Sequence, residues 1–284
     1  MYWLPVLGAV ALGGGTVLQK HVLKHKRVST RLYQVAMFLV IVIIMLPLLY
    51  FFWKFDSGAL EFWNVVIFLA VIGFSVLANV FALYAMKWEK VENLEPAKVL
   101  EPLFVILLAI MFSYIFGTEL FARNTKVIIP AFIAVGALVF SHVKKHHFDM
   151  NKYFLAAIVG SFFYASELVI SMLVLDFYSP ISFYFLRSLG VFFISFLIFR
   201  PHFSKLSRNV RWEIFFIGLI WVFYRVAVYY GYLSLGVIST TLVFMLGPIF
   251  VYAFAYKFLR EKIHWRNLVA SMIIVACVLY AVLT

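Results

Sequence analysis

Long apolar runs, separated by short polar gaps, follow one another along the whole chain. Ten runs are long enough to cross about 30 Å of hydrocarbon as helices. They lie near residues 2–23, 32–53, 63–86, 94–117, 125–142, 153–175, 180–199, 212–235, 238–259 and 264–283. The alternating segments typical of an outer-membrane barrel are absent from the sequence. The pattern therefore predicts an all-α integral membrane protein with ten transmembrane helices.

The two halves of the chain share a pattern of prolines and glutamates. Pro102 is followed by a long apolar stretch up to Glu119, and Pro248 is followed in the same way by Glu261. Each glutamate precedes the last apolar run of its half. Because each half has five runs, an odd number, the second half must be inverted in the membrane relative to the first. We therefore expect two inverted five-helix repeats with a site between them near the midplane.

Composition supports a membrane protein and changes the meaning of the net charge. Of the 284 residues, 65% are hydrophobic and 13% charged, against about 45–50% and roughly 25% in soluble domains. A net charge of +12 would indicate a nucleic-acid partner if the basic residues formed one wet, polar face. They lie instead in short gaps between apolar runs, so we expect no nucleic-acid partner and interpret the charge as a topology signal.

Basic residues are divided unevenly between the gaps. Those after odd-numbered runs hold seventeen of the 24 lysines and arginines, whereas those after even-numbered runs hold only Lys54, Arg123 and Lys126. Short loops rich in lysine and arginine favour the cytoplasmic side. We therefore predict a multi-pass protein of the cell (plasma) membrane with both termini outside.

Several of these positions resemble the drug/metabolite transporter superfamily, in particular its EamA-type ten-helix members. In that family a proline in the ninth span is followed by a glutamate and then by a span of small residues. Pro248, Glu261, Ala270 and Cys277 match in position, with alanine and cysteine in place of the usual glycines. Arg187 matches the arginine common early in the seventh span, and the corresponding place in the second span holds Gln34. A looser match in the first half lies at Pro102, Glu119 and Gly136, and the glycines of the first and sixth spans (Gly13, Gly14 and Gly160) also fit.

The resemblance implies EamA-like repeats at residues 1–142 and 151–284, and a transporter of small metabolites. The tryptophan that usually precedes the glycine of the sixth span is missing. Family members usually have both termini in the cytoplasm, opposite to the orientation that the charges predict. We keep the orientation that the charges predict.

Charged side chains inside the runs are the candidates for a substrate site, because a lone charge in lipid costs about 2.5–3.5 kcal/mol and must face protein or water. In the eighth run Trp221, Arg225, Tyr229 and Tyr232 fall along one helix face. A cation flanked by aromatic rings can hold an anionic group. The alternative is an arginine paired with a neighbouring helix.

The sixth and seventh runs add further candidates. Tyr164 and Glu167 share one face, and Arg187 follows Tyr184 at a spacing that also gives a shared face. Glu167 has three possible roles: binding a cationic group, carrying a coupling proton, or pairing with Arg187 or Arg225. For Arg187, helix packing and ligand contact both remain open.

The fourth run brings charges to the first half. Glu95, Lys98 and Glu101 are successive i,i+3 neighbours, and Pro102 should bend the helix or free a carbonyl near residue 98. Glu95 suits the membrane interface, whereas Lys98 and Glu101 are better cavity candidates. The aligned positions of the second half carry no charge, so the expected site is asymmetric.

Two histidine pairs, His21/His25 and His142/His146, have the i,i+4 spacing that a metal can use. No acidic or cysteine partner is fixed near them in the sequence, so we expect no metal site. Small and polar residues of the first and third runs are expected to serve helix packing. They are Gly13, Thr16, Lys20, Ser75 and Asn79.

The charges inside the runs nearly balance. They are Lys20, Lys98, Arg187 and Arg225 against Glu95, Glu101 and Glu167. Such a set suits an amphoteric solute such as an amino acid, and it suits internal ion pairs equally well. We therefore expect a secondary transporter that moves a small organic metabolite by alternating access. The expected substrate-binding residues are Lys98, Glu101, Tyr164, Glu167, Arg187, Trp221, Arg225 and Tyr229.

The main alternative is an integral-membrane, lipid-modifying enzyme. Such chemistry needs clustered acidic residues or a nucleophile with its base near a membrane surface, and the gaps offer neither. The sequence also lacks a GxxxxGK[ST] motif for ATP. We therefore expect no enzyme and no cofactor. The expected partners are membrane lipids and a small solute, and the sequence leaves the coupling proton or ion and the oligomeric state open.

Overall fold

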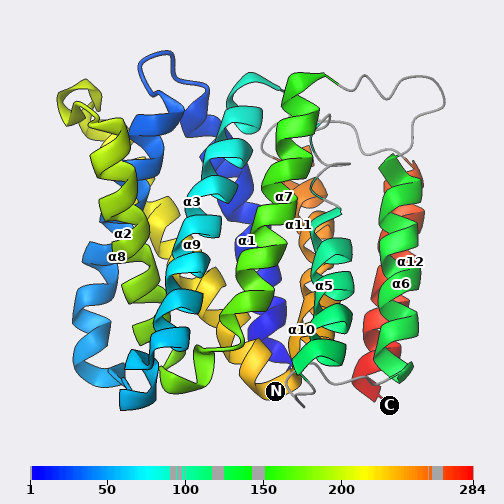
Figure 1. The fold of residues 1–284 in the computed structure, drawn as a ribbon. Coiled ribbons are helices and arrows are strands. Elements are labelled where there is room, and N and C mark those ends of the chain that lie inside the picture. Colours follow the sequence, from blue (N-terminus) through cyan, green and yellow to red (C-terminus); the bar gives the residue numbers. More distant parts are fainter. Residues whose placement is uncertain are drawn as a thin grey trace.

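A computed structural model describes residues 2–89, 94, 98, 100–116, 125–142, 151–254, 256–257 and 265–283. Within these residues the chain is a bundle of helices (Figure 1). The α-helices are α1 (Trp3–Leu23), α2 (Thr30–Phe52), α3 (Phe62–Trp88), α5 (Leu100–Phe116), α6 (Thr125–His142), α7 (Lys152–Ser171), α8 (Pro180–Phe199), α9 (Arg208–Leu235), α10 (Val237–Phe244), α11 (Gly247–Phe254) and α12 (Trp265–Leu283). Three short 3-10 turns join them: η1 (Ser57–Leu60), η3 (Leu175–Phe177) and η4 (Phe203–Lys205).

The prediction of an all-helical membrane protein is confirmed, and each predicted span has a helical counterpart. In the described part of the chain, seven helices are long and apolar enough to cross a membrane, α10 and α11 counting as one. Shorter apolar helices correspond to the fourth, fifth and tenth predicted spans. Large apolar side chains such as Tyr50, Phe62 and Leu283 are exposed on the outside of the bundle. A lipid solvent accepts such side chains, whereas water would not.

The ninth predicted span is interrupted, which the sequence analysis missed. Two turn residues, Met245 and Leu246, separate α10 from α11. Pro248 has no N–H and cannot donate to the carbonyl of Phe244, so the ladder of helical hydrogen bonds stops there. The N–H of Leu246 bonds instead to the carbonyl of Val243 at 3.0 Å. The break places irregular backbone inside the bundle, where protein rather than lipid surrounds it.

Some predicted features fall outside the described residues. These are Glu95, Glu119, His146 and Glu261. A bend at Pro102 would change the helical turn before it. Only Lys98 and Leu100 of that turn are described, so the expected bend stays a prediction. The mixed pairing Glu95–Lys98–Glu101 is likewise described only for its last two members.

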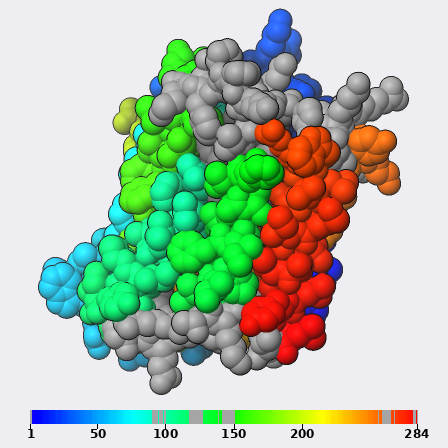
Figure 2. Space-filling model, turned by 90° about the vertical axis from the view of Figure 1, so that its right-hand side faces the viewer, coloured from blue at the N-terminus to red at the C-terminus, as the bar shows by residue number. Residues whose placement is uncertain are grey.

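Helices of the first half pack mainly against helices of the second. α1 lies against α9, α3 against α7, and α2 against α8. α6 and α12 lie side by side at one edge of the bundle, where Figure 2 shows them in green and red. The buried core therefore runs along the boundary between the two halves, and that boundary positions the polar residues described below.

Glycine allows the closest of these helix contacts. A Cβ on Gly13 of α1 would lie 2.8 Å from Phe250 Cβ and 3.0 Å from the backbone nitrogen of Val251 in α11. A Cβ on Gly160 of α7 would lie 3.1 Å from the backbone nitrogen of Ala82 in α3. Backbone atoms cannot move aside as a side chain can, so the packing expected for the glycines of the first span is seen at Gly13.

The two termini lie at the same end of the bundle (Figure 1). At that end the connections α2–α3 and α7–α8 bond to each other: Asp56 N donates to Phe177 O at 2.8 Å, and Ser179 Oγ donates to Phe52 O at 2.5 Å. Loops at the opposite end, which we call the basic end, bring cations together. Lys26, Arg27, Lys87 and Lys205 line one depression there.

The first prediction concerns orientation. If the basic end faces the cytoplasm, alkaline phosphatase fused after Thr284 will be active and a green fluorescent protein fused there will be dark. The reason is that basic loops are retained on the cytoplasmic side. A fluorescent C-terminal fusion with an inactive phosphatase would reverse the orientation and favour the one usual in the resembling family.

The second prediction concerns the α1–α11 contact. Gly13→Ala should lower the free energy of unfolding by about 1–3 kcal/mol, because the added methyl meets backbone atoms of α11. Gly14→Ala is the matched control, since its Cβ would meet only the edge of the Phe254 ring, at 3.8 Å. Thermal unfolding of both variants in the same detergent measures the difference. Equal melting temperatures would show that α1 and α11 do not approach so closely.

Candidate functional site

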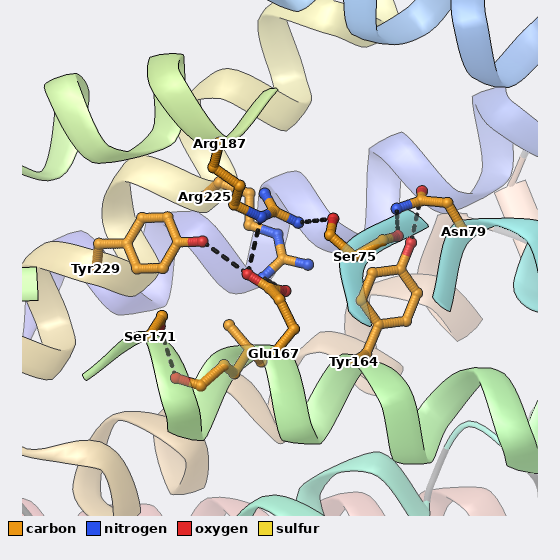
Figure 3. A network of polar contacts seen from close by, with 9 residues as sticks. Ser75, Asn79, Tyr164, Glu167, Ser171, Arg187, Arg225 and Tyr229 are labelled. Atoms are coloured by element: carbon orange, nitrogen blue, oxygen red, sulfur yellow. Dashed lines mark hydrogen bonds and ion pairs between the residues drawn. The ribbon is translucent and has the colours of Figure 1, made fainter. Parts of the chain in front are cut away.

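A buried carboxylate, Glu167 of α7, lies at the centre of a polar cluster between α7, α8 and α9 (Figure 3). Its Oε1 is 2.9 Å from Arg187 Nε of α8 and accepts a hydrogen bond of 2.9 Å from the Tyr229 hydroxyl of α9. Its Oε2 is 3.3 Å from Arg225 Nη1, also of α9. The Glu167 side chain is fully buried. One carboxylate therefore holds partners from two neighbouring helices.

The two arginine contacts are ion pairs rather than aligned hydrogen bonds. Arg187 Nε and Arg225 Nη1 lie within ion-pair distance of Glu167, yet neither meets the geometry of a hydrogen bond among the described residues. Charge attraction therefore holds the group together. Guanidinium groups have five N–H donors each, so this arrangement leaves donors for other acceptors.

Arg187 extends the cluster to the first half of the chain. Its Nη2 donates to Ser75 Oγ of α3 at 2.5 Å, and its guanidinium carbon lies 5.5 Å from the centre of the Tyr184 ring. Both Arg187 and Ser75 are buried. The helix-packing role left open for Arg187 is therefore seen, because this side chain joins α3 to α7 and α8.

Asn79 continues the same network along α3. The hydroxyl of Tyr164 donates to Asn79 Oδ1 at 2.8 Å, and Asn79 Nδ2 donates to the backbone carbonyl of Ser75 at 2.8 Å (Figure 3). Ser75 and Asn79 thus do more than allow close helix packing: they supply the polar partners of Arg187 and Tyr164. A buried tyrosine hydroxyl needs such a partner.

Arg225 lies between aromatic rings at the edge of the cluster. Its guanidinium carbon is 5.4 Å from the centre of the Tyr164 ring and 5.8 Å from that of Tyr224. A ring face attracts a cation, and the attraction strengthens when water is excluded. One side of Arg225 also faces a cavity.

Two adjoining cavities open beside this cluster. One has a volume of about 120 Å³ and the other about 140 Å³. Both are lined by Leu12, Thr16, Lys98, Glu101 and Tyr224. The smaller cavity extends to Thr241 and Pro248, at the break between α10 and α11. The larger one extends to Arg187 and Arg225. Together they connect the charged cluster with the broken span.

The charges around the cavities do not cancel. Arg187 and Arg225 face the single carboxylate of Glu167, which gives this group a formal charge of +1. On α5, Lys98 and Glu101 add one charge of each sign to the cavity wall. The described residues of the site therefore carry one positive charge in excess. Charge is costly in a membrane interior, so an anionic group would complement this formal excess among the described residues.

Comparison with known proteins identifies the second half of the chain. A model of the EamA-like transporter family matches residues 151–283. The resemblance inferred from Pro248, Glu261 and Arg187 is thereby confirmed for this half of the chain. The described helices are those of a multi-pass membrane protein.

Solved structures agree on the fold. Among known structures 28 chains match. One, described as "Crystal structure of protein", aligns over 99% of this chain and 97% of its own with a TM-score of 0.73 and 15% identity. At this identity the similarity establishes the fold alone. No protein of curated function matches the sequence.

The fold brings most of the predicted site residues to one place. Six line the larger cavity: Lys98, Glu101, Tyr164, Arg187, Trp221 and Arg225. Glu167 and Tyr229 lie behind the arginines, with Tyr229 fully buried. Of the roles left open for Glu167, pairing is seen, and it involves both arginines. Substrate binding by any of these residues stays a prediction.

Lys20 joins two helices, in agreement with the packing role expected for the polar residues of the first run. Its Nζ donates to the backbone carbonyls of Met86 and Glu89. Those carbonyls end α3 and have no partner within the helix, so a lysine is well suited to satisfy them. Lys20 therefore stabilises the end of α3, and it lines neither of the two cavities.

Sequence reasoning also missed two residues of the cavity wall. Tyr224 lines both cavities and flanks Arg225, although it lies next to the predicted stripe rather than on it. Gln34 of α2 lines the larger cavity and donates to Ser195 Oγ of α8 at 3.0 Å. The only available signal for Gln34 was its match to the position of Arg187 in the other half.

The third prediction tests the charge cluster. Glu167→Ala should destabilise the fold by about 3–5 kcal/mol, because it leaves two guanidinium groups without their anion. Adding Arg187→Met should recover part of the loss, because one of the unpaired cations is then removed. Ser171→Ala is the control on the same helix: its hydroxyl bonds only to Leu168 O, at 2.7 Å, and should cost about 1 kcal/mol.

Thermal unfolding of the single and double variants in detergent measures this coupling. Residues in one ionic network show interaction free energies of about 0.5–3 kcal/mol. If the losses of Glu167→Ala and Arg187→Met simply add, the two side chains do not interact in the way described.

Proposed function

We propose that this chain is a secondary transporter that moves a small organic metabolite, amino-acid-like or otherwise amphoteric, across the cell membrane. The observation that carries the proposal is the shared carboxylate: two buried guanidinium groups face one glutamate beside a cavity. A solute carboxylate reaching Arg225 would complete the charge balance. Arginine suits this task because its planar donors match a carboxylate.

The wall opposite Arg225 offers a complement for a cationic group. Glu101 of α5 lines both cavities and makes no hydrogen bond or ion pair with another described residue. Glu167, by contrast, is occupied by three partners. Glu101 is therefore the better candidate to bind the ammonium group of an amphoteric solute. Tyr164, Trp221 and Tyr224 supply aromatic walls between the two charges.

The cavity volumes agree with a small solute. An apolar protein cavity of about 150 Å³ holds a molecule the size of benzene. The two cavities, of about 120 and 140 Å³, thus match a solute with a short or ring-sized side chain. Thr241, Phe244 and Pro248 of the broken span border the smaller cavity and would contact that side chain.

The helix pairing supports two inverted repeats and alternating access. If each span of the first half corresponds to the span five places later in the second half, α1 corresponds to α7 and α3 to α9. A twofold rotation that exchanges the two halves then turns the contact α1–α9 into the contact α3–α7. The same rotation leaves the contacts α2–α8 and α6–α12 unchanged. This pattern is what a pseudo-twofold axis in the membrane plane produces. The site lies between the halves, where their relative movement can expose it to either side.

The fourth prediction tests solute class and site together. Purified protein in liposomes should exchange amino acids in a counterflow assay, and exchange neither the corresponding decarboxylated amines nor N-acylated acids. Arg225→Gln should raise the KM for the amino acid about 10–100-fold, the value of a lost charge-assisted hydrogen bond. Glu101→Gln should raise it similarly, because the ammonium group loses its counter-ion.

Matched controls are an arginine and a glutamate far from the cavities. Arg208→Gln and Glu61→Gln change exposed residues and should leave exchange unchanged. Normal transport by Arg225→Gln and Glu101→Gln would overturn the site assignment. Exchange of amines or acids alone would overturn the amphoteric class, and turnover of a lipid substrate would favour the membrane enzyme instead.

A further inference from the structure

We propose that His21, His25 and Glu213 form a binding site for a first-row transition metal ion such as Zn²⁺, at the basic end between α1 and α9. The candidate ligand atoms of the three side chains lie within 4.8 Å of one another. The two histidines are at the end of α1 and just beyond it, and Glu213 is in the second turn of α9. The proposal is independent of the transport function.

The spacing of the two histidines places both imidazole rings on the same side of α1. His21 and His25 are one helical turn apart, and their ring centres are 5.7 Å apart in an edge-to-face arrangement. Their nitrogen atoms can therefore turn toward a common ion. Ligand atoms around a tetrahedral Zn²⁺ lie about 3.3 Å apart, given bonds of about 2.0–2.1 Å. Small rotations of exposed side chains bring the three atoms to that separation.

Glu213 supplies a carboxylate oxygen that accepts no hydrogen bond among the described residues. Its Oε2 lies 3.9 Å from His25 Nε2. The oxygen atom is inaccessible to water yet makes no hydrogen bond within the described residues. The side chain as a whole is 38% exposed, so an ion can reach this oxygen beside the two imidazoles. A metal ion bound to both histidines would satisfy it.

The ligand set and its surroundings favour a transition metal over a hard cation. Two imidazoles and one carboxylate suit Zn²⁺, Cu²⁺ or Ni²⁺, whereas Mg²⁺ and Ca²⁺ prefer oxygen ligands. Imidazole nitrogens bind a transition metal ion through their lone pairs, so two of the three ligands add no charge to the site. The open positions around the ion are left for water.

The site was not expected from the sequence, and the reason is distance along the chain. The pair His21/His25 was noted, but no acidic residue lies near it in the sequence. The packing of α1 against α9 supplies Glu213 from the other half of the chain. Bound metal would thus cross-link the two halves at the basic end, and should stabilise their contact.

The fifth prediction is a zinc titration of the full-length protein, purified in detergent without a histidine tag. Calorimetry with ZnCl₂ should show a saturable site that His21→Ala or His25→Ala weakens at least tenfold. Glu213→Gln should weaken it about three- to tenfold, because the carboxylate charge is lost while the shape is kept. Saturating Zn²⁺ should raise the melting temperature of the wild type and leave that of His25→Ala unchanged.

Controls separate this site from other histidines of the chain. His202→Ala and His146→Ala should bind Zn²⁺ as the wild type does, and Mg²⁺ should not compete. Each variant is first compared with the wild type in metal-free unfolding, so that a folding defect is recognised. No saturable binding by the wild type would overturn the proposal. So would binding that survives in the double variant His21→Ala/His25→Ala, or that is lost in His146→Ala.

Discussion

The fold depends on one constraint: lipid offers no hydrogen bonds, so every polar group inside the bundle must find its partner in protein. Glu167 is where this constraint acts most strongly. Its carboxylate contacts Arg187, Arg225 and Tyr229, and through Arg187 it reaches Ser75 of α3. Four helices, α3, α7, α8 and α9, are thus held by one charged group. The same constraint explains why Lys20 ends at carbonyls of α3 rather than in a cavity.

Hydropathy located the spans well because the bilayer imposes both their length and their apolar surface. The predicted run 180–199 agrees with α8, and 125–142 with α6, to the residue. The break between α10 and α11 could not be found in this way, because Met245 and Leu246 are as apolar as their neighbours. Pro248 was visible in the sequence. Its missing N–H breaks the helix only if the surrounding helices shelter the carbonyl that loses its partner. Sequence spacing does not contain that information.

The sequence predicts which residues form the candidate site, but not which of them contact one another. Glu167, Arg187 and Arg225 could be picked out because a charge in an apolar run is costly and therefore rare. Which of them pair depends on how α7, α8 and α9 meet, and the sequence left several pairings open for Glu167. Helical spacing predicts only the residues that share a face with Arg225. A cavity also contacts residues beside that face, and Tyr224 is one of them. Glu213 shows the same limit at the basic end.

The division between bound and available charges gives the proposed transport a physical basis. The ion pairs around Glu167 lie within α7, α8 and α9 of the second half, whereas Glu101 belongs to α5 of the first half, on the cavity wall, and has no ion-pair partner among the described residues. A solute that contacts Arg225 and Glu101 together would join the two halves. A ligand shifts a conformational equilibrium only by the difference in its affinity for the two states. Contacts that span the two halves are the ones whose strength changes when the halves move, so the proposed transport would depend on a solute that is held at both ends.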